Sequence, residues 1–503
     1  MSSQMTASPN LDPEDWEAFR AASRRALDDM IDFLQTVRER PVWQPAPPEV
    51  LREFRQPLPT EPEALDDVLA DFAALIRPYA TGNLHPLFMG WVHGAGTPVG
   101  MVAEMLAAGL NANCGGRNHI ALDVERQIAA WAAGLFGFPA EASGVFVTGT
   151  SAANHLALLI ARNACLGDDV RRDGLRWAGN QLVAYTSGEA HGCIKQAVEM
   201  AGIGSRYLRT IAVDDKGAMR TDLLAAAIAA DRAQGLRPFL VAATAGTVNT
   251  GAFDDLAAIA DLCHTEKLWF QVDGAFGALV ALAPGLRHLV AGIERADSIA
   301  FDFHKWAHVP YDAGFLLVRD PVRHRRTFSN PAAYLHRAES GLAAGEVWPC
   351  DLGPDLSRGF RALKTWFTFR VHGADRIGAC IEQTCRLAGY LEMRLIEQSN
   401  LFEVAAPVAL NIVCFGLRGS PDGELNKAIV MDLHERGVAA PSTTIIGGRT
   451  VIRAAIVNHR TTEADMDGFM TALRDSALRV TLAQMRRGDE AETAPAPAAA
   501  AVS

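Results

Sequence analysis

Two stretches of the chain decide its fold class: Leu268-Trp-Phe-Gln-Val-Asp-Gly-Ala275 and Asp297-Ser-Ile-Ala-Phe-Asp-Phe-His-Lys-Trp306. Each contains a short, mostly apolar run of strand length, followed by polar or glycine residues at which a strand can end. Similar runs lie at 183–186, 239–244 and 314–318, and helical patterns at 189–201 and 256–263 separate them. Apolar strands that alternate with helices are typical of a sheet covered on both faces. The sequence therefore predicts an α/β fold with a mostly parallel central sheet.

The regions around this sheet differ from it in pattern. Residues 1–90 are predicted to form a helical arm, which includes a proline-rich stretch, and residues 91–370 a large domain. Residues 371–485 combine a long helical segment with two strand patterns, which indicates a smaller C-terminal α+β domain. Residues 486–503 are rich in Ala, Pro and Glu and are expected to be a disordered tail.

The composition excludes several classes of protein. The 503 residues include 47 Lys and Arg against 58 Asp and Glu, a net charge of −11, which argues against a nucleic-acid partner. No apolar run reaches the ~18 residues of a membrane span, and the N-terminus does not resemble a secretory signal. The eight cysteines are scattered and lack zinc spacing. We therefore expect reduced thiols, no metal site and a cytoplasmic protein.

Chemically useful side chains follow several of the predicted strands, and in parallel sheets such groups meet at the carboxyl ends of the strands. Asp273 and Lys305 each follow a strand, and the stretch from Val145 to Asn154 runs from a strand into a Gly-Thr-Ser helix start. Taken singly, each has an ordinary explanation, such as an N-cap. Together they meet the needs of pyridoxal phosphate: a Schiff-base lysine, an acid for the pyridine nitrogen and a helix start for the phosphate. His191 adds a flat ring that can stack on the cofactor.

The motifs then resemble one known family, the group II pyridoxal-phosphate decarboxylases, which include aromatic-L-amino-acid decarboxylase and glutamate decarboxylase. The resemblance covers residues 65–480, and it implies the type I pyridoxal-phosphate fold and an active homodimer whose N-terminal arm wraps around the partner. The matching motifs are His85-Pro-Leu-Phe88, Thr186-Ser-Gly-Glu-Ala-His191, Val272-Asp-Gly-Ala275, His304-Lys-Trp306 and Ser357-Arg-Gly-Phe-Arg-Ala-Leu-Lys364.

The resemblance also implies roles for the matching residues. Lys305 is expected to hold the cofactor as a Schiff base, Asp273 to pair with the pyridinium nitrogen, and His191 to stack on the ring. The activity it implies is that of a carboxy-lyase, which converts a small L-amino acid to its amine and carbon dioxide. The remaining cofactor contacts are expected from Ser151, Ala152 and Ala153 at the phosphate, Thr247 and Ala275 at the ring, and Asp302 and His304 near the phosphate and the lysine.

One departure from the family concerns the proton that returns to Cα. The family carries a loop tyrosine for this step, and counting back from Lys364 puts Trp348 or Pro349 at its position. If no donor replaces the tyrosine, the alternatives are oxidative deamination to an aldehyde, transamination, or a cofactor-binding protein with little catalysis. In place of the tyrosine, the proton could come to Cα from Tyr334, His191, His336 or a water.

A second departure concerns the substrate pocket. Asn111 and Asn113 stand where aromatic-substrate members carry bulky apolar residues, and Arg117 follows them. This segment is either a capped loop with a solvated arginine or a polar pocket in which Asn113 and Arg117 contact the substrate, Arg117 by pairing with an acid. Arg453 matches a family arginine near the site and is either a substrate contact or purely structural. The polar side chains of Asn111 and Asn113 argue against a plain aromatic substrate, and the sequence does not identify the amino acid.

Overall fold

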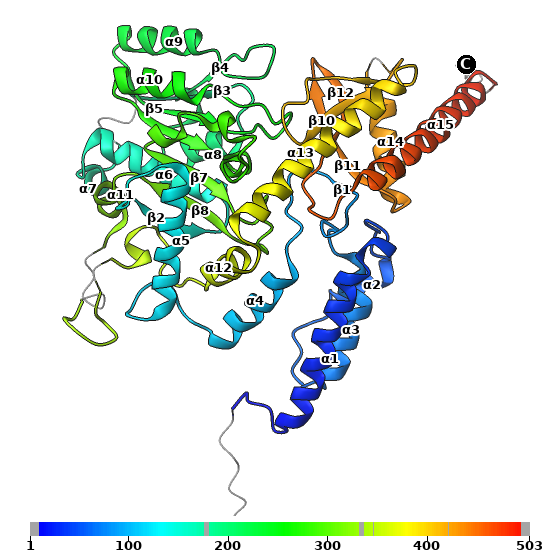
Figure 1. The fold of residues 1–503 in the computed structure, drawn as a ribbon, viewed down its shortest axis with the longest axis horizontal. Coiled ribbons are helices and arrows are strands. Elements are labelled where there is room, and N and C mark those ends of the chain that lie inside the picture. The colour runs from blue at the N-terminus through cyan, green and yellow to red at the C-terminus, as the bar shows by residue number, and fades with distance from the viewer. Residues whose placement is uncertain (1–9, 176–180, 331–336, 346, 421, 494–503) are drawn as a thin grey trace, which may run out of the picture.

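The computed structural model describes residues 10–175, 181–330, 337–345, 347–420 and 422–493, and it contains a seven-stranded and a five-stranded sheet (Figure 1). The larger sheet lies in the body of the molecule, and the smaller one lies beside it, near the C-terminal helix. Within the described ranges, no helix combines the length and the apolarity that crossing a membrane requires.

The larger sheet confirms the predicted architecture. Strands β7, β6, β5, β3 and β4 pair in parallel in that order, whereas β8 runs antiparallel to both of its neighbours, β2 and β7. The order across the sheet is β2 (Ser143–Val147), β8 (Gly314–Val318), β7 (Ser298–Asp302), β6 (Trp269–Asp273), β5 (Arg237–Thr244), β3 (Leu182–Ser187) and β4 (Leu208–Ile211).

Helices cover both faces of this sheet, which is why its strands are apolar at nearly every position. Side chains of α5 (Ile120–Phe136), α9 (Thr221–Ala233) and α10 (Leu256–Glu266) pack in one core cluster with alternate strand residues. Side chains of α6 (Thr150–Leu166) and α8 (Cys193–Met200) pack with the other set. The body also contains the helices α4 (Pro98–Leu110), α7 (Val170–Asp173), α11 (Pro321–Phe328) and α12 (Arg361–His372).

The smaller domain differs from the expected boundaries at both ends. Its sheet has the order β1 (Phe88–Met89), β11 (Ala440–Ile446), β12 (Arg449–Ala455), β10 (Ile412–Leu417) and β9 (Phe402–Val404), so the end of the expected arm contributes a strand to it. Its helices are α13 (Ala374–Glu397), α14 (Glu424–Glu435) and α15 (Glu463–Thr493). Residues 486–493, expected to be disordered, continue α15 because most of them are good helix formers; residues 494–503 lie outside the described residues.

The N-terminal arm projects from the body (Figure 1). It contains α1 (Trp16–Gln35), α2 (Pro48–Glu53) and α3 (Leu65–Asp71). Asp15 starts α1 by accepting hydrogen bonds from the backbone N–H groups of Glu17 and Ala18. Ala22 is the one buried residue of α1, so the arm leaves most of its own surface exposed.

A buried ion pair fastens the segment before α12 to the large domain. Arg358 donates to both carboxylate oxygens of Glu125, at 2.7 and 3.1 Å, and to the carbonyls of Cys114 and Phe146, both at 2.9 Å. The exposed fractions of the two charged side chains are only 2% and 7%. Removal of one partner would leave the other charge buried without its counter-ion.

We therefore expect Arg358→Met to lower the free energy of unfolding by about 3–5 kcal/mol, measured by urea denaturation. The matched control is Arg172→Met, because Arg172 pairs with Asp169 at the surface, where such pairs contribute at most about 1 kcal/mol. Equal stabilities of the two variants would contradict a structural role for the buried pair.

Candidate active site

The carboxyl ends of the parallel strands meet at one edge of the larger sheet. Thr244, Asp273 and Asp302 are the last residues of β5, β6 and β7, and the strand register sets these ends side by side. A cavity of about 400 Å³ lies at this edge. It brings together seven of the predicted cofactor residues, namely Ser151, His191, Asp273, Ala275, Asp302, His304 and Lys305.

Lys305 lies in the turn that follows β7. Its Nζ is 3.1 Å from Oδ2 of Asp302, and Oδ1 of the same carboxylate accepts a hydrogen bond of 2.8 Å from the backbone N–H of Thr150. One carboxylate thus holds both the lysine and the first residue of α6. The lysine is therefore placed beside a helix N-terminus, where an anion is stabilised.

His304 is held as a neutral ring beside this lysine. Its Nδ1 accepts a hydrogen bond of 3.0 Å from the backbone N–H of Ala313, and its Nε2 faces Oδ2 of Asp302 at 3.6 Å. Burial lowers the pKa of His304 to about 4, although the charge of Asp302 opposes the shift. His304 therefore orients the lysine turn without adding a second positive charge.

Asp273 is a fully enclosed carboxylate at the end of β6. Burial raises its pKa, and the charge of Lys305 and a hydrogen bond of 3.2 Å from the backbone N–H of Ala275 oppose that shift. A buried carboxylate is costly unless a cation or donors satisfy it. The site is thus built for a positively charged partner next to Asp273, as a protonated pyridine nitrogen would be.

Two buried hydroxyls show that the cavity suits pyridoxal phosphate. The side-chain oxygens of Thr150 and Thr244 have no hydrogen-bond partner among the described residues, and both residues line the cavity. The structure shows no side-chain cap on α6, so the Thr150 hydroxyl at the positive end of this helix suits a phosphate group. With His191 and Ala275 for the ring faces and Lys305 for the carbonyl carbon, the residues present fit this cofactor.

Three predicted cofactor contacts do not line the cavity. The backbone N–H groups of Ala152 and Ala153 donate to the carbonyl of Gly149, at 2.9 and 3.1 Å, because these residues already lie inside the first turn of α6. Ala153 is completely buried. The hydroxyl of Thr247 accepts from the backbone N–H of Ala252 at 3.1 Å and stabilises the loop after β5. Thr148 and Thr150 line the cavity in their place.

The predicted substrate residues Asn113 and Arg117 also lie outside this cavity. Oδ1 of Asn113 accepts from the backbone N–H groups of Gly115 and Arg358, both at 3.0 Å, which caps the loop. The guanidinium of Arg117 stacks on the ring of Trp348 at 4.9 Å. Within one chain, these contacts match the interpretation of the segment as a capped loop.

Trp348 belongs to the buried core and not to the cavity. Its exposed fraction is 1%, the guanidinium of Arg337 covers its ring at 4.5 Å, and its Nε1 donates to the carbonyl of Ala344 at 3.3 Å. An indole held in this way cannot reach a reacting carbon at Lys305. Tyr334 and His336, two of the donors considered, lie outside the described residues.

The sequence reasoning gave no site role to four aromatic side chains of the cavity: Trp91, His93, Phe276 and Tyr311. The rings of Tyr311 and His304 have centroids 4.3 Å apart. Gly94 allows the segment of Trp91 and His93 to reach the site, since a Cβ there would lie 2.1 Å from the carbonyl oxygen of His304. The stretch Trp91-Val-His-Gly94 is rich in ring side chains, but it does not follow a predicted strand of the central sheet, so a search at strand ends does not find it.

Arg453 is buried behind the cavity wall. It donates to the carbonyls of Trp91 at 3.0 Å and Asn249 at 3.2 Å, and also to the carbonyl of Val248. Burial lowers its pKa to about 10. Because Trp91 and Val248 line the cavity, Arg453 positions its wall.

We expect Arg453→Met to lower the free energy of unfolding by about 3 kcal/mol in the absence of any amino acid, since three carbonyls lose the donor that the buried guanidinium provides. Urea denaturation of the cofactor-loaded protein measures this change. A direct substrate contact would instead raise KM and leave the denaturation midpoint unchanged.

A lysine and an opposing buried acid at the strand ends of this sheet, beside a phosphate-ready helix start, define a pyridoxal-phosphate enzyme of the type I fold. The chain belongs to the family described as "Pyridoxal-dependent decarboxylase conserved domain", which matches residues 47–418. It is therefore a carboxy-lyase that uses pyridoxal phosphate to convert an L-amino acid to its amine and carbon dioxide.

Relatives with known activities are similar over nearly the whole chain. The aromatic-L-amino-acid decarboxylase of Bacillus atrophaeus is 32% identical over 93% of this chain and 97% of its own. The structure of Oryza sativa TDC with PLP and tryptamine has a TM-score of 0.85 at 25% identity, covering 93% of this chain and 99% of that one. The structure of Catharanthus roseus tryptophan decarboxylase with L-tryptophan has a TM-score of 0.83 at 26% identity, covering 93% and 100%.

Proposed function

We propose that this decarboxylase acts as a homodimer in the cytoplasm on an L-amino acid with an aromatic side chain. The observation that carries the substrate class is the aromatic lining of the cavity by Trp91, His93, Phe276 and Tyr311. Flat rings of this kind bind an aromatic side chain by stacking and edge contacts. The names of the relatives, which act on aromatic amino acids and tryptophan, support the same class.

Different residues of the cavity have different roles in the reaction at the substrate Cα. Bound pyridoxal phosphate supplies an electron sink for the bond that breaks at Cα. Asp273 would hold the proton on the ring nitrogen, and His191 and Ala275, which line the cavity, would lie against the ring. Lys305 would hold the cofactor through its amine, and Asp302, 3.1 Å away, is the counter-ion of that amine.

The amine is the product that this geometry favours. Trp348 is sequestered between two arginines, so a side chain of the cavity or of the loop segment must return the proton to Cα. Of the three candidate side chains, Tyr334, His191 and His336, only His191 lies in the part of the chain that the structure describes, and it lines the cavity. A proton donor at the cavity would end the reaction at the amine before oxygen can react.

The test is one assay of the purified, cofactor-loaded protein with L-tryptophan, L-tyrosine, L-phenylalanine, L-histidine and L-glutamate. Carbon dioxide, amine, aldehyde and hydrogen peroxide are measured together. We expect carbon dioxide with stoichiometric amine from an aromatic substrate. Turnover of L-glutamate alone would overturn the aromatic class, and aldehyde with peroxide would establish oxidative deamination.

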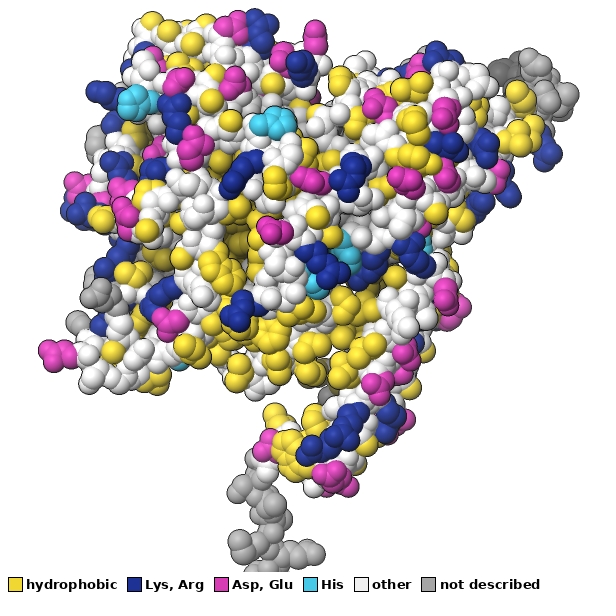
Figure 2. Space-filling model, in the orientation of Figure 1, with side chains coloured by type: hydrophobic (Ala, Val, Ile, Leu, Met, Phe, Trp, Pro, Cys, Tyr) yellow, Lys and Arg dark blue, Asp and Glu magenta, His cyan; other side chains and the backbone are white. Residues whose placement is uncertain are grey.

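The exposed apolar surface supports the homodimer. Figure 2 shows hydrophobic side chains gathered along the lower part of the body, in the region of α4 and beside the projecting arm. On α4, Met105, Leu106 and Leu110 are exposed, and on the arm Phe54 is 59% exposed. A contiguous apolar surface of this kind marks an interface. The homodimer predicted from the family resemblance would cover it.

Sedimentation velocity tests this assembly. We expect the double variant Leu106→Glu/Leu110→Glu to sediment as a monomer and to lose activity, because two charges cannot be buried in an apolar interface. Met431→Glu, on the exposed face of α14, is the matched control and is expected to remain dimeric. A wild-type monomer with full activity would overturn the proposal.

The cysteines support a reducing compartment. All eight are free thiols in the described structure, as is usual for proteins of the cytoplasm. Fractionation of the source cells tests this location, and recovery of the enzyme outside the cytoplasm would contradict it.

A further inference from the structure

Three side chains that can form hydrogen bonds lie in a row along one face of β6. Trp269, Gln271 and Asp273 alternate along the strand and point to the side that α6 and α8 cover. At ~3.3 Å per residue, this row spans about 13 Å, from the start of the strand to the catalytic edge. Each of the three is at least nine-tenths buried.

A continuous set of hydrogen bonds joins the two ends of this row. Nε1 of Trp269 donates to Oγ of Ser298 at 2.8 Å, and Ser298, on the neighbouring strand β7, donates to Oε1 of Gln271. Nε2 of Gln271 donates to Oδ1 of Asn154 on α6 at 2.8 Å. We call these residues, together with Cys193, the donor chain.

The donor chain ends at the catalytic carboxylate. Nδ2 of Asn154 donates to Sγ of Cys193 at 3.5 Å, and the Cys193 thiol donates to Oδ2 of Asp273 at 3.7 Å. Burial, and next the charge of Asp273, raise the pKa of this thiol to about 12. The thiol therefore keeps its proton at neutral pH and acts as a donor to Asp273.

The chemistry of its members gives the donor chain a single direction. An indole N–H can only donate and a carboxylate can only accept, so the two ends are fixed. The amide of Gln271 cannot be flipped, because its Nε2 also donates to the carbonyl of Val272 at 3.1 Å. Every group between thus accepts from one neighbour and donates to the next. Aligned hydrogen bonds in a buried site polarise one another in the same sense.

We propose that the donor chain Trp269–Ser298–Gln271–Asn154–Cys193 holds Asp273 in place and in its ionised form, and that Cys193 is the positioning residue that delivers this effect. The ring nitrogen of the cofactor then keeps its proton, because the carboxylate opposite is the weaker base. The effect does not depend on which amino acid is the substrate.

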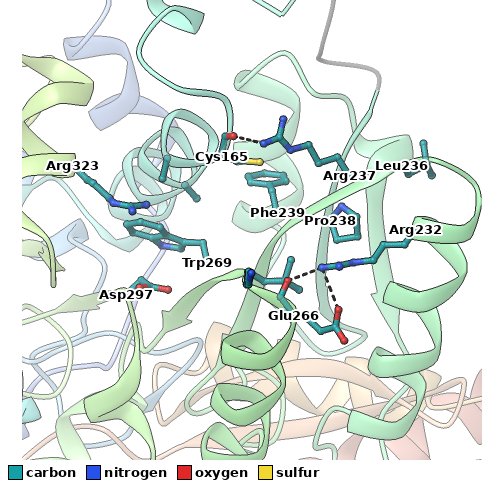
Figure 3. A pocket seen from close by; sticks show the side chains of 14 residues that line it. Cys165, Arg232, Leu236, Arg237, Pro238, Phe239, Glu266, Trp269, Asp297 and Arg323 are labelled. Atoms are coloured by element: carbon teal, nitrogen blue, oxygen red, sulfur yellow. Dashed lines mark hydrogen bonds and ion pairs between the residues drawn. The ribbon is translucent and has the colours of Figure 1, made fainter.

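The far end of the donor chain lies well away from the cofactor. Trp269 lines a second cavity of about 530 Å³, together with Asp297 and Arg323, at the opposite edge of the sheet (Figure 3). A change at Trp269 therefore touches neither cofactor nor substrate. It tests whether a change at the far end of the donor chain alters the catalytic end from outside the cofactor cavity.

The first experiment compares the Cys193→Ala and Cys193→Ser holoenzymes with the unaltered enzyme. Two quantities are measured: the dissociation constant of pyridoxal phosphate, by titration of the apoprotein, and the nitrogen-15 resonance of the ring nitrogen in labelled bound cofactor. We expect Cys193→Ala to bind the cofactor about tenfold more weakly and to shift the resonance toward that of neutral pyridine. Cys193→Ser, which retains a donor, is expected to restore both.

Cys193 also lines the cofactor cavity, so Cys193→Ser, which keeps a donor in the same place, controls for a direct effect on the cofactor. The control for loss of a buried thiol as such is Cys263→Ala, on α10, outside both the cavity and the donor chain. It is expected to leave both quantities unchanged, so that loss of a buried thiol as such is separated from loss of the donor. If Cys193→Ala retains the wild-type dissociation constant and resonance, or if Cys193→Ser fails to restore them, the proposal is overturned.

The second experiment is a double-mutant cycle with Trp269→Phe, which removes the first donor and keeps an aromatic ring. Alone, it is expected to shift the nitrogen-15 resonance in the same direction as Cys193→Ala, but by less. In the Cys193→Ala background it is expected to add nothing, because the connection to Asp273 is already broken. Additive shifts, or no shift from Trp269→Phe alone, would overturn transmission along the donor chain.

Discussion

Lys305→Ala is expected to abolish the covalent attachment of pyridoxal phosphate and to lower kcat/KM by more than about 1,000-fold. Lys305 is the lysine that lines the cavity, and its amine lies 3.1 Å from Asp302 at the end of β7. Alanine removes the nucleophile and leaves Asp302 bound to the backbone of Thr150. The fold of the site is therefore retained while its chemistry is lost.

The absorbance spectrum of the purified protein and the mass after borohydride reduction measure the attachment directly. Lys195→Ala, at an exposed position of α8, is the control and should retain the cofactor bond and the activity. A Lys305→Ala protein with an unchanged spectrum would refute the assignment of the whole site.

Asp273→Asn is expected to lower kcat by about 100- to 1,000-fold, the usual effect of removing one preorganised electrostatic group. Asparagine has a similar size but no charge, so it no longer favours a proton on the ring nitrogen. An N-methylated cofactor, which carries a permanent positive charge, should restore a large part of the lost rate in this variant. A variant with full activity on the ordinary cofactor would show that Asp273 does not control the ring.

The same carboxylate predicts a dependence of cofactor binding on pH. Burial raises the pKa of Asp273 above that of a free aspartate. The favourable charge is therefore present above this raised pKa and is lost as the pH falls through it. We expect the affinity of the apoprotein for pyridoxal phosphate to weaken on acidification, and Asp273→Asn to remove that part of the pH dependence, as titration at several pH values would show.

Local patterns explain why much of the fold and the centre of the site could be predicted. The apolar runs at 239–244, 268–272 and 314–318 are strands in the structure, because strands buried on both faces need apolar residues throughout. Asp273 and Lys305 were identified because strand ends are local features and parallel strands share one functional edge. The predicted end of the arm at residue 90 was less accurate, because the short strand β1 exists only by pairing with β11.

The sequence by itself determined the α/β class and the cofactor, and it led to Lys305, Asp273 and His191, which line one cavity, since each follows a strand at a fixed offset. The tertiary structure alone decided the surroundings of these residues. In the folded chain, Ala153 and Thr247 lie outside the cavity, and Arg453 hydrogen-bonds to residues of the cavity wall. Hydrogen bonds through residues of four elements connect Trp269 to Asp273. Such contacts depend on packing between distant segments, and residue spacing along the chain does not encode which side chains will meet there.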